Sequence, residues 1–224
     1  MDWAKAIQRN CEALLRIVAE LFALAQGGVE VRLPRHVYFA MLRILRPAES
    51  ALRRLIILAA HGLVLKPRGF CAFPATSFQS TEAKSAPAFA LLDSLKHFED
   101  PTSQTFEAPL PRISVPGFID PTFLASPIAS RDDFISAQRL YQRLNALKRV
   151  LDNLRGEARR LARWRLRRDL ALASRGPLRP ARLSSLRPGR PPGFKKRSDH
   201  AVDDLLRECH ALALDILSPP RTAS

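Results

Sequence analysis

Residues 138–170 read QRLYQRLNALKRVLDNLRGEARRLARWRLRRDL, and this stretch decides the fold class. Alanine and leucine recur with alternating three- and four-residue spacing, at Ala137, Leu140, Leu144, Leu147, Leu151, Leu154, Ala158 and Leu161. This spacing is a heptad repeat, which places a narrow apolar stripe along one face of a helix. We call the stripe the heptad seam. Arginines and lysines occupy the other faces, so the sequence predicts one long, arginine-rich helix over residues 131–174.

Individual residues indicate where this helix begins and where it is least stable. Ser130 is a suitable N-cap, and Asp132 and Asp133 fall in the first turn, where the helix dipole favours negative charge. Gly156 lies inside the predicted helix and costs about 1 kcal/mol relative to alanine. That glycine is consistent with either a close helix crossing or a bend, and the sequence leaves both open.

Length and composition place the chain among ordinary globular proteins. Its 224 residues suffice for one domain or for a domain with a tail, and 46% of them are hydrophobic. Three widely spaced cysteines, Cys11, Cys71 and Cys209, suggest free thiols in a reducing compartment, so we expect a cytoplasmic protein. The N-terminus does not resemble a secretion signal, and no apolar run reaches the ~20 residues of a transmembrane helix.

Positive charge is concentrated in residues 138–197. This range holds 19 lysines and arginines against three acidic residues, which gives +16, whereas the whole chain carries +15. The remainder is therefore close to neutral. Arginine outnumbers lysine by 29 to 7. Two explanations of that excess stay open: a surface that binds anions, or GC-rich bacterial coding.

Residues 1–62 read as an N-terminal helical pair. The segments 2–26 and 35–61 each place apolar side chains on one face, and glycines follow both. Pro47 interrupts the second segment, which predicts either one kinked helix or two shorter helices. Between them, residues 29–33 suit a short strand or a linker. A core helical hairpin explains the region better than a helix-turn-helix, because LRRLIILAAHGL is too apolar for a DNA groove.

Residues 63–130 form a proline-rich irregular arm in this interpretation, far longer than the connections usual in compact domains. Within the arm, residues 87–98 predict a short helix. Pro87 suits a first helical position, and several apolar side chains after it share one face. The helix either docks on the bundle or serves as a motif that fits the groove of a protein partner.

The C-terminal part consists of a linker, a helix and a tail. Residues 175–198 alternate arginine with proline, which favours an extended, exposed linker. Residues 199–217 predict a helix that is capped by Ser198 or Asp199 and packs back on the bundle. Residues 218–224 read as a disordered tail. The sequence thus predicts an all-α protein, a partial helical bundle with one long arginine-rich helix and one irregular arm.

Motifs that carry chemistry are scarce. The five histidines are scattered, no cysteine pair has metal-ligand spacing, and the sequence has no phosphate-binding glycine loop or nucleophile motif. Cys209 and His210 are neighbours, but adjacent residues of a helix point about 100° apart and do not form a nucleophile–base pair. We therefore expect no enzyme activity, no metal site and no cofactor.

The arginine-rich stretch is the one feature that suggests a function. Guanidinium groups bond phosphate oxygens in pairs, so exposed arginines suit DNA or RNA and bind it without regard to sequence. Trp164 either stacks on a base or anchors the helix in the core. The candidate nucleic-acid-binding residues are Arg159, Arg160, Arg163, Trp164, Arg165, Arg167, Arg168, Arg187, Arg190, Lys195, Lys196 and Arg197.

Two other functions stay open on the sequence alone. A helical protein–protein adaptor would bind a partner through residues 87–98 or through the heptad seam, and its basic face would simply be solvated. The seam could also pair with a second copy to give a homodimer. The third function is peripheral association with an anionic membrane, because arginines also bind anionic headgroups.

The last third of the chain also resembles a known group of sequences. Over residues 140–217 it contains LDNLRGEARRLARW, LRPGRPPG and HAVDDLLRECHALALDIL, of which RRLARW, PLRP and RPGRPPG are the most specific. This part is similar to a family of small basic alphaproteobacterial proteins that have no assigned activity. The resemblance implies a bacterial cytoplasmic protein whose N-terminal helices are a more variable half, and it transfers no site residues.

Overall fold

The computed structural model describes residues 2–25, 32–63, 65, 88–94, 133–174 and 184–217. Within them lie five helices and two short strands: α1 (Trp3–Leu24), β1 (Arg32–Pro34), α2 (Arg35–Ala59), β2 (Phe134–Ser136), α3 (Gln138–Asp152), α4 (Leu154–Ser174) and α5 (Ala201–Leu217). The prediction of a helical bundle is therefore confirmed, with a minor sheet added. Most of the predicted arm, residues 175–183, the tail at 218–224 and the Ser130 cap lie outside the described residues.

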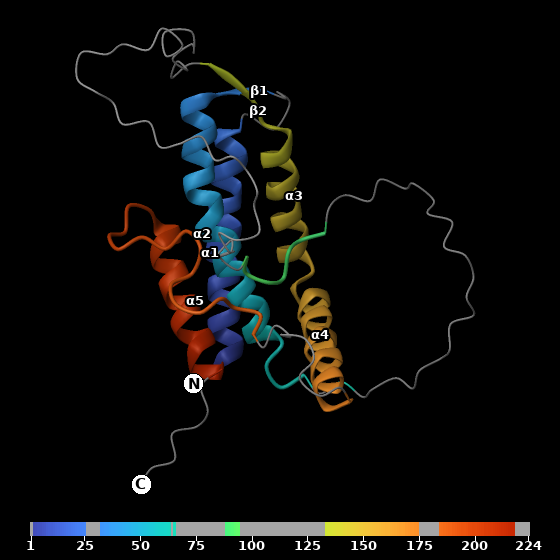
Figure 1. Ribbon diagram of the computed structural model, residues 1–224. Helices are drawn as coiled ribbons and strands as arrows, with labels where there is room; N and C mark the ends of the chain where they lie inside the picture. The colour runs from blue at the N-terminus through green and yellow to red at the C-terminus, as the bar shows by residue number, and fades with distance from the viewer. Residues whose placement is uncertain are drawn as a thin grey trace, which may run out of the picture.

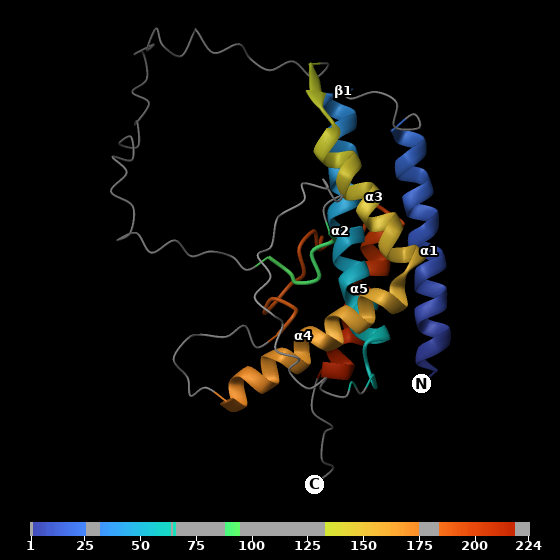
Figure 2. The same cartoon turned by 90° about the vertical axis from the view of Figure 1, so that its right-hand side faces the viewer.

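Helix α2 is the centre of the bundle. It packs against α1, α3, α4 and α5, and Figure 1 shows α4 and α5 on opposite sides of it. From Pro47 to Leu58 nearly every side chain of α2 is buried, as expected for a helix surrounded by others. Figure 2 shows that α4 runs obliquely outward from the bundle while the other helices lie more nearly side by side.

Helix α1 confirms the prediction for residues 2–26. The carboxylate of Asp2 accepts a hydrogen bond from the backbone N–H of Lys5 at 3.2 Å, so Asp2 is the N-cap. Leu14, Val18 and Leu21 lie on one face of the helix and are buried in the core. The amphipathic spacing therefore decided both the existence and the orientation of this helix.

Pro47 lies inside one continuous helix, α2, so the single-helix alternative is the correct one and a helix-turn-helix is not formed. Proline has no N–H, which removes one hydrogen bond from the helix interior. The chain packs Gly193 against the backbone at Pro47, and the hydroxyl of Ser50 donates to the carbonyl oxygen of Pro192 at 2.7 Å. A distant segment thus covers the helix where its own bonding is interrupted.

The prediction of one long helix over residues 131–174 is wrong, because the chain forms β2, then α3, then α4. Asn153 separates the two helices, with φ −130° and ψ 47°. Its side-chain oxygen accepts the backbone N–H of Gly156 at 3.1 Å, which is the bonding of an N-cap for α4. A Cβ at position 156 would lie 2.6 Å from the Asn153 amide, so glycine leaves room for this cap. Of the two open explanations of Gly156, the bend is the correct one.

The heptad seam is buried within the chain's own core on both sides of the break. The fully or almost fully buried positions are Ala137, Leu140, Leu144, Leu147, Ala158 and Leu161. Leu151 and Leu154 are partly buried and pack against the same core. Because the seam already contacts α1 and α2, it does not present a free surface to a second copy, and the predicted seam-mediated homodimer loses its interface.

The two strands close one end of the bundle. Strand β1 pairs antiparallel with β2, with Arg32 opposite Ser136, Leu33 opposite Ile135 and Pro34 opposite Phe134. The sequence allowed either a strand or a linker over residues 29–33. Residues 32 and 33 of this range belong to strand β1. The backbone N–H of Arg35 donates to the carbonyl oxygen of Asp133, which joins the start of α2 to the start of β2.

Residues 88–94 form neither a helix nor a strand and bend at Leu92, so the helix predicted over 87–98 is wrong there, and residues 87 and 95–98 lie outside the described part. Phe89, Leu91 and Asp93 are buried at alternate positions, which is the burial of an extended strand rather than of a helix. The backbone N–H of Asp93 donates to the carbonyl oxygen of Ser185 at 3.0 Å. The segment therefore docks on the bundle, one of its two predicted roles, in a different conformation.

The C-terminal helix packs back on the bundle as predicted. Helix α5 lies along α2, but its cap is His200 rather than Ser198 or Asp199, because the His200 ring accepts the N–H of Val202 at 3.1 Å. The linker before it was expected to be extended and exposed throughout. In its described part, residues 184–198, Leu186 and Pro191 are instead buried against the bundle.

Gly193 and Gly189 offer a matched test of this packing. Both have positive φ, at 80° and 77°. A Cβ at Gly193 would lie 2.7 Å from the Pro47 nitrogen, whereas one at Gly189 meets nothing within 4 Å. We expect Gly189→Ala to cost about 1 kcal/mol through backbone strain alone, and Gly193→Ala to cost at least about 2 kcal/mol. Urea unfolding measures both, and equal losses would contradict the close approach at Pro47.

Candidate functional site

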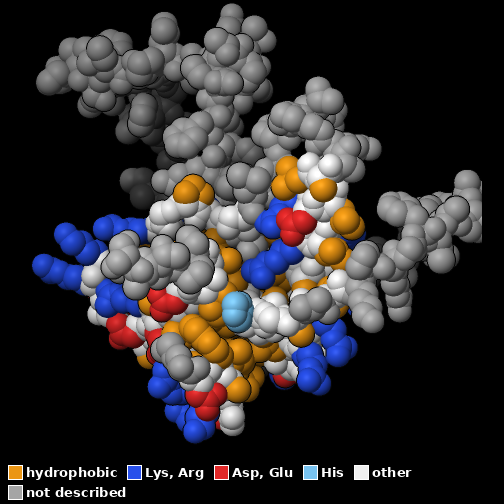
Figure 3. Space-filling view, turned by 90° about the horizontal axis from the view of Figure 1, so that it is seen from below, with side chains coloured by type: hydrophobic (Ala, Val, Ile, Leu, Met, Phe, Trp, Pro, Cys, Tyr) orange, Lys and Arg blue, Asp and Glu red, His pale blue; other side chains and the backbone are white. Residues whose placement is uncertain are grey.

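The predicted binding residues fall into two groups that do not share one surface. The first group lies on α4, and the second lies on residues 187–197, which lead into α5 on the other side of α2. Figure 3 shows the lysine and arginine side chains in several separate clusters around an exposed hydrophobic area. The single continuous basic surface imagined from the sequence is therefore divided.

One row of arginines on α4 is exposed along its whole length. Arg155, Arg159, Arg163 and Arg167 are each four residues apart, and all four are exposed. Residues four apart lie on nearly the same face of a helix, so they form a ridge about 18 Å long. We call this ridge the arginine row. Among the described residues, no acidic side chain forms an ion pair with any of its four members.

The other predicted residues of α4 are engaged with the protein itself. Arg160 donates to the carbonyl oxygen of Phe89 at 3.3 Å and pairs with Glu157 at 2.8 Å. Arg168 pairs with Asp169 and lies over the ring of Trp164, which packs against the core. One nitrogen of Arg165, Nη2, is buried, and burial lowers the pKa of that guanidinium. Arg160 and Trp164 thus join α4 to the rest of the bundle, whereas Arg168 pairs within its own helix and the buried Nη2 of Arg165 has no hydrogen-bond partner in the described structure.

The residues of the second group also divide into engaged and exposed ones. Arg187 donates from its backbone to Asp93 and from its side chain to the carbonyl oxygen of Arg190. Lys195 pairs with Asp199 at 3.1 Å and approaches the buried Asp203 at 3.6 Å. Arg190 is exposed and lies over the ring of Phe194, and Lys196 and Arg197 are exposed as well.

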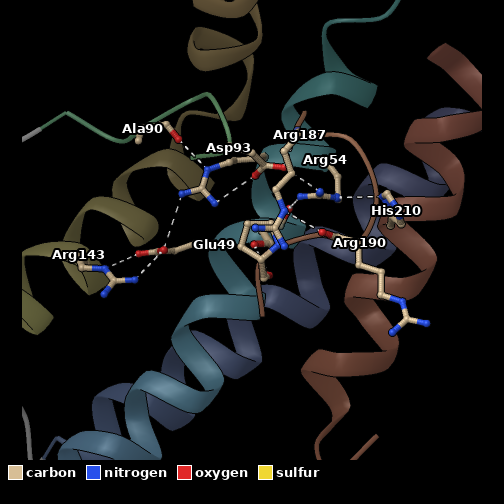
Figure 4. A network of polar contacts seen from close by, with 11 residues as sticks. Glu49, Arg54, Ala90, Asp93, Arg143, Arg187, Arg190 and His210 are labelled. Carbon is tan, nitrogen blue, oxygen red and sulfur yellow. Dashed lines mark hydrogen bonds and ion pairs between the residues drawn. The ribbon is translucent and has the colours of Figure 1, made fainter. Parts of the chain in front are cut away.

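The most buried charges of the described structure form a polar network that the sequence did not reveal. Arg54 and Asp93 are both 0% exposed, and their side chains form an ion pair at 3.0 Å (Figure 4). Arg54 also donates to the carbonyl oxygen of Ser50 at 2.7 Å and to Nδ1 of His210 at 3.3 Å. Burial lowers the pKa of Arg54, and the charge of Asp93 opposes that shift. This network ties α2, α5 and residues 88–94 together.

A second part of the network joins α2 to α3. Arg143 forms a two-pronged ion pair with Glu49, at 2.8 Å and 2.9 Å, and the hydrogen bond raises the pKa of Arg143. Arg53 lies between the two carboxylates, 3.8 Å from Glu49 and 3.6 Å from Asp93. Its Nε donates to the carbonyl oxygen of Ala90 at 2.9 Å. Ion pairs and hydrogen bonds thus crosslink three helices, α2, α3 and α5, and the docked segment.

Burial governs the chemistry of the one fully buried cysteine in the described residues, Cys209. Burial raises the pKa of the Cys209 thiol to about 12, so this thiol stays protonated near neutral pH and is a poor nucleophile. No group of three or more histidine, cysteine, aspartate or glutamate side chains is arranged to hold a metal ion in the described part of the chain.

A sequence signal for the buried network did exist. Arg54 lies in an apolar run of α2, on the same face as Ser50, Ala51 and Leu58, which would be buried in any bundle. A cation in that position needs a buried carboxylate, and Asp93 is the acid within an otherwise apolar stretch, AFALLDSL. What the sequence could not supply is that the two positions meet, since that depends on the docking of residues 88–94.

Comparison with family models, curated proteins and solved structures finds no match to this chain. No helix among the described residues combines the length and the apolar character needed to cross a lipid bilayer. The function must therefore be inferred from the geometry of the chain itself.

Removal of the carboxylate of Asp93 tests the buried network. Asp93→Asn leaves Arg54 buried without its counter-charge, so we expect the free energy of unfolding to fall by at least about 3 kcal/mol. The control is Asp169→Asn, which removes an exposed ion pair with Arg168 and should cost less than about 1 kcal/mol. Urea titrations followed by circular dichroism measure both, and similar small losses would contradict a structural role for Asp93.

The hydrogen bond from Arg54 to His210 predicts a pH dependence. Burial and the charge of Arg54 lower the pKa of His210. The lowered pKa agrees with the hydrogen bond, since Nδ1 accepts it only while that nitrogen is unprotonated. The unfolded chain therefore binds a proton at higher pH than the folded chain. This part of the stability is complete above the ordinary histidine pKa of about 6.5 and is lost as the pH falls through the lower pKa of the folded state.

Replacement of the ring isolates this contribution. His210→Gln keeps a neutral acceptor, so stability should fall less steeply between pH 7 and 5, by up to about 1.4 kcal/mol per pH unit. His61→Gln, at an exposed histidine, is the matched control. Thermal unfolding at a series of pH values provides the comparison, and an unchanged slope in His210→Gln would contradict the assignment.

Proposed function

We propose that this protein binds nucleic acid without sequence specificity through the arginine row of α4. The observation that supports the proposal is the row itself: four exposed arginines at four-residue spacing, with no acidic partner among the described residues. Arg155 was not among the predicted binding residues and joins them here. On a helix face that is merely exposed to solvent, basic side chains usually form ion pairs with acidic side chains three or four residues away. The arginines of this row form no such pairs with described residues.

The dimensions of the row suit a phosphate backbone. Its four guanidiniums span about 18 Å, and one DNA strand carries a phosphate every 3.4 Å along the duplex axis, so the row can follow roughly five phosphates. Each guanidinium can donate two hydrogen bonds to one phosphate. Such contacts position a protein on nucleic acid and read no bases, which makes the expected binding sequence-independent.

The adaptor alternative gains no support from the described residues of its two surfaces. The heptad seam is buried against α1 and α2, and Phe89 and Leu91 of the docked segment are buried as well. Membrane association keeps one supporting observation, because Leu170 and Leu172 are exposed near the end of the arginine row. Anionic lipid is therefore included as a competing ligand in the test.

Four arginine-to-glutamine changes at positions 155, 159, 163 and 167 test the proposal. We expect affinity for labelled duplex DNA and RNA to fall at least about tenfold in all sequences alike. The slope of log affinity against log salt should become shallower by about four, since four phosphate contacts are lost. Fluorescence anisotropy at several salt concentrations measures both quantities on the full chain.

A charge-matched control separates a local surface from net charge. Glutamine at four exposed arginines outside α4, namely Arg16, Arg32, Arg43 and Arg46, removes the same charge and should change the salt slope little. Equal effects of the two quadruple variants would show that binding follows total charge and would reject the row. Binding to anionic vesicles but not to DNA or RNA would favour the membrane alternative instead.

A further inference from the structure

A cavity separate from the arginine row lies between α2, α3 and the docked segment. Its volume is about 390 Å³, and its lining residues are Glu49, Arg53, Ala88, Phe89, Ala90, Arg139, Gln142, Arg143 and Ala146. Cavities that bind small molecules commonly start near this size. The four residues from α3 are spaced at i, i+3, i+4 and i+7, so they form one wall on a single helix face.

The lining of the cavity is positively charged after its internal pairs are counted. Three arginines face one glutamate, and Glu49 is already bonded through both oxygens to Arg143. Arg143 uses Nε and Nη2 for that pair, which leaves its Nη1 pointing away from Glu49. Arg139 is exposed, and no described acidic residue forms an ion pair with it. Within the described part of the chain, Arg139 therefore has no acidic partner and Arg143 keeps one nitrogen outside its pair with Glu49, and the two side chains lie one turn apart on α3.

The opposite side of the cavity is apolar and held in position. Phe89, from the docked segment, is 7% exposed, and the guanidinium of Arg53 lies 5.4 Å from the centre of its ring, within the roughly 6 Å range of cation–π contacts. Ala146, on the α3 wall, is also 7% exposed and continues the apolar surface. The carbonyl oxygens of Phe89 and Ala90 accept bonds from Arg160 and Arg53. This side therefore offers a fixed apolar surface next to a cationic one.

We propose that this cavity binds a small organic anion, with a phosphate or carboxylate head and a compact apolar body. The head lies between Arg139 and Arg143, where the fork of each guanidinium matches two oxygens. The body packs against Phe89 and Ala146. Glu49 holds Arg143 in place before the ligand arrives, so little side-chain ordering is required on binding. The site uses none of the arginine row and is independent of nucleic-acid binding.

Calorimetric titration of the full chain with phenyl phosphate tests the site. Benzoate carries a carboxylate in place of the phosphate, inorganic phosphate lacks the body, and phenol lacks the charge. We expect saturable binding of phenyl phosphate or benzoate with a dissociation constant of about 1 mM or tighter, and binding at least about tenfold weaker for inorganic phosphate and phenol. Comparison of the first two probes identifies the preferred head.

Two variants locate the binding. Arg139→Gln removes an exposed, unpaired cation and should weaken binding at least about tenfold, and Ala146→Leu should do the same by filling the cavity. Arg155→Gln removes equal charge from α4 and should leave the affinity unchanged. The proposal is overturned by absent binding of both anions, or by Arg139→Gln and Ala146→Leu variants that bind as the unaltered chain does. Loss of affinity in Arg155→Gln alone would assign the binding to the arginine row instead.

Discussion

The buried ion pair between Arg54 and Asp93 is the constraint on which the rest of the arrangement depends. A guanidinium with no exposed surface is tolerated in a helical core only when a carboxylate and hydrogen-bond acceptors surround it. Helix α2 cannot supply that carboxylate at the site, so it comes from the segment at 88–94. The burial of this part of α2 therefore depends on the docking of residues 88–94. His210 of α5 accepts a further hydrogen bond from Arg54.

The same constraint divides the arginines of the chain into two populations. One population donates its hydrogen bonds to carboxylates and carbonyl oxygens of the protein, and so crosslinks its elements and adds little positive charge to the surface. Its members are Arg53, Arg54, Arg143 and Arg160. Among the described residues, no carboxylate pairs with the arginine row of α4, and the side-chain bond from Arg167 to the carbonyl oxygen of Arg163 stays within the row. A net charge of +15 consequently overstates the surface available to an anion. The surface available to an anion consists of the guanidiniums that the fold leaves without an acidic partner, and the positions of the few acidic residues decide which ones these are.

Helical periodicity accounts for what was predictable. The stripes of α1, α2 and α5 and the heptad seam correctly identified buried side chains, because apolar spacing reports burial directly. Periodicity did not locate the break at Asn153, since the seam continues across it without a change of spacing. An asparagine followed three residues later by glycine was the available local signal. Residues 88–94 were wrongly predicted to be helical because the spacing of their apolar side chains fits both the period of a helix and burial at alternate positions. The long-range hydrogen bonds to Ser185 and Arg53 hold the segment in its non-helical conformation.

The break at Asn153 also separates the two proposed anion sites, which lie on one arginine-rich stretch. A continuous helix would keep the basic side chains of α3 and α4 on a single rod, exposed along its length. Because the chain turns there, α3 stays beside α2 and the docked segment, where Arg139 and Arg143 border a cavity. Helix α4 instead runs outward (Figure 2), and the four side chains of its arginine row are exposed. A pair of guanidiniums beside a cavity suits the one small anion that we propose there, whereas an exposed row suits the repeating phosphates of the proposed nucleic acid, and the turn at Asn153 keeps the two arrangements apart.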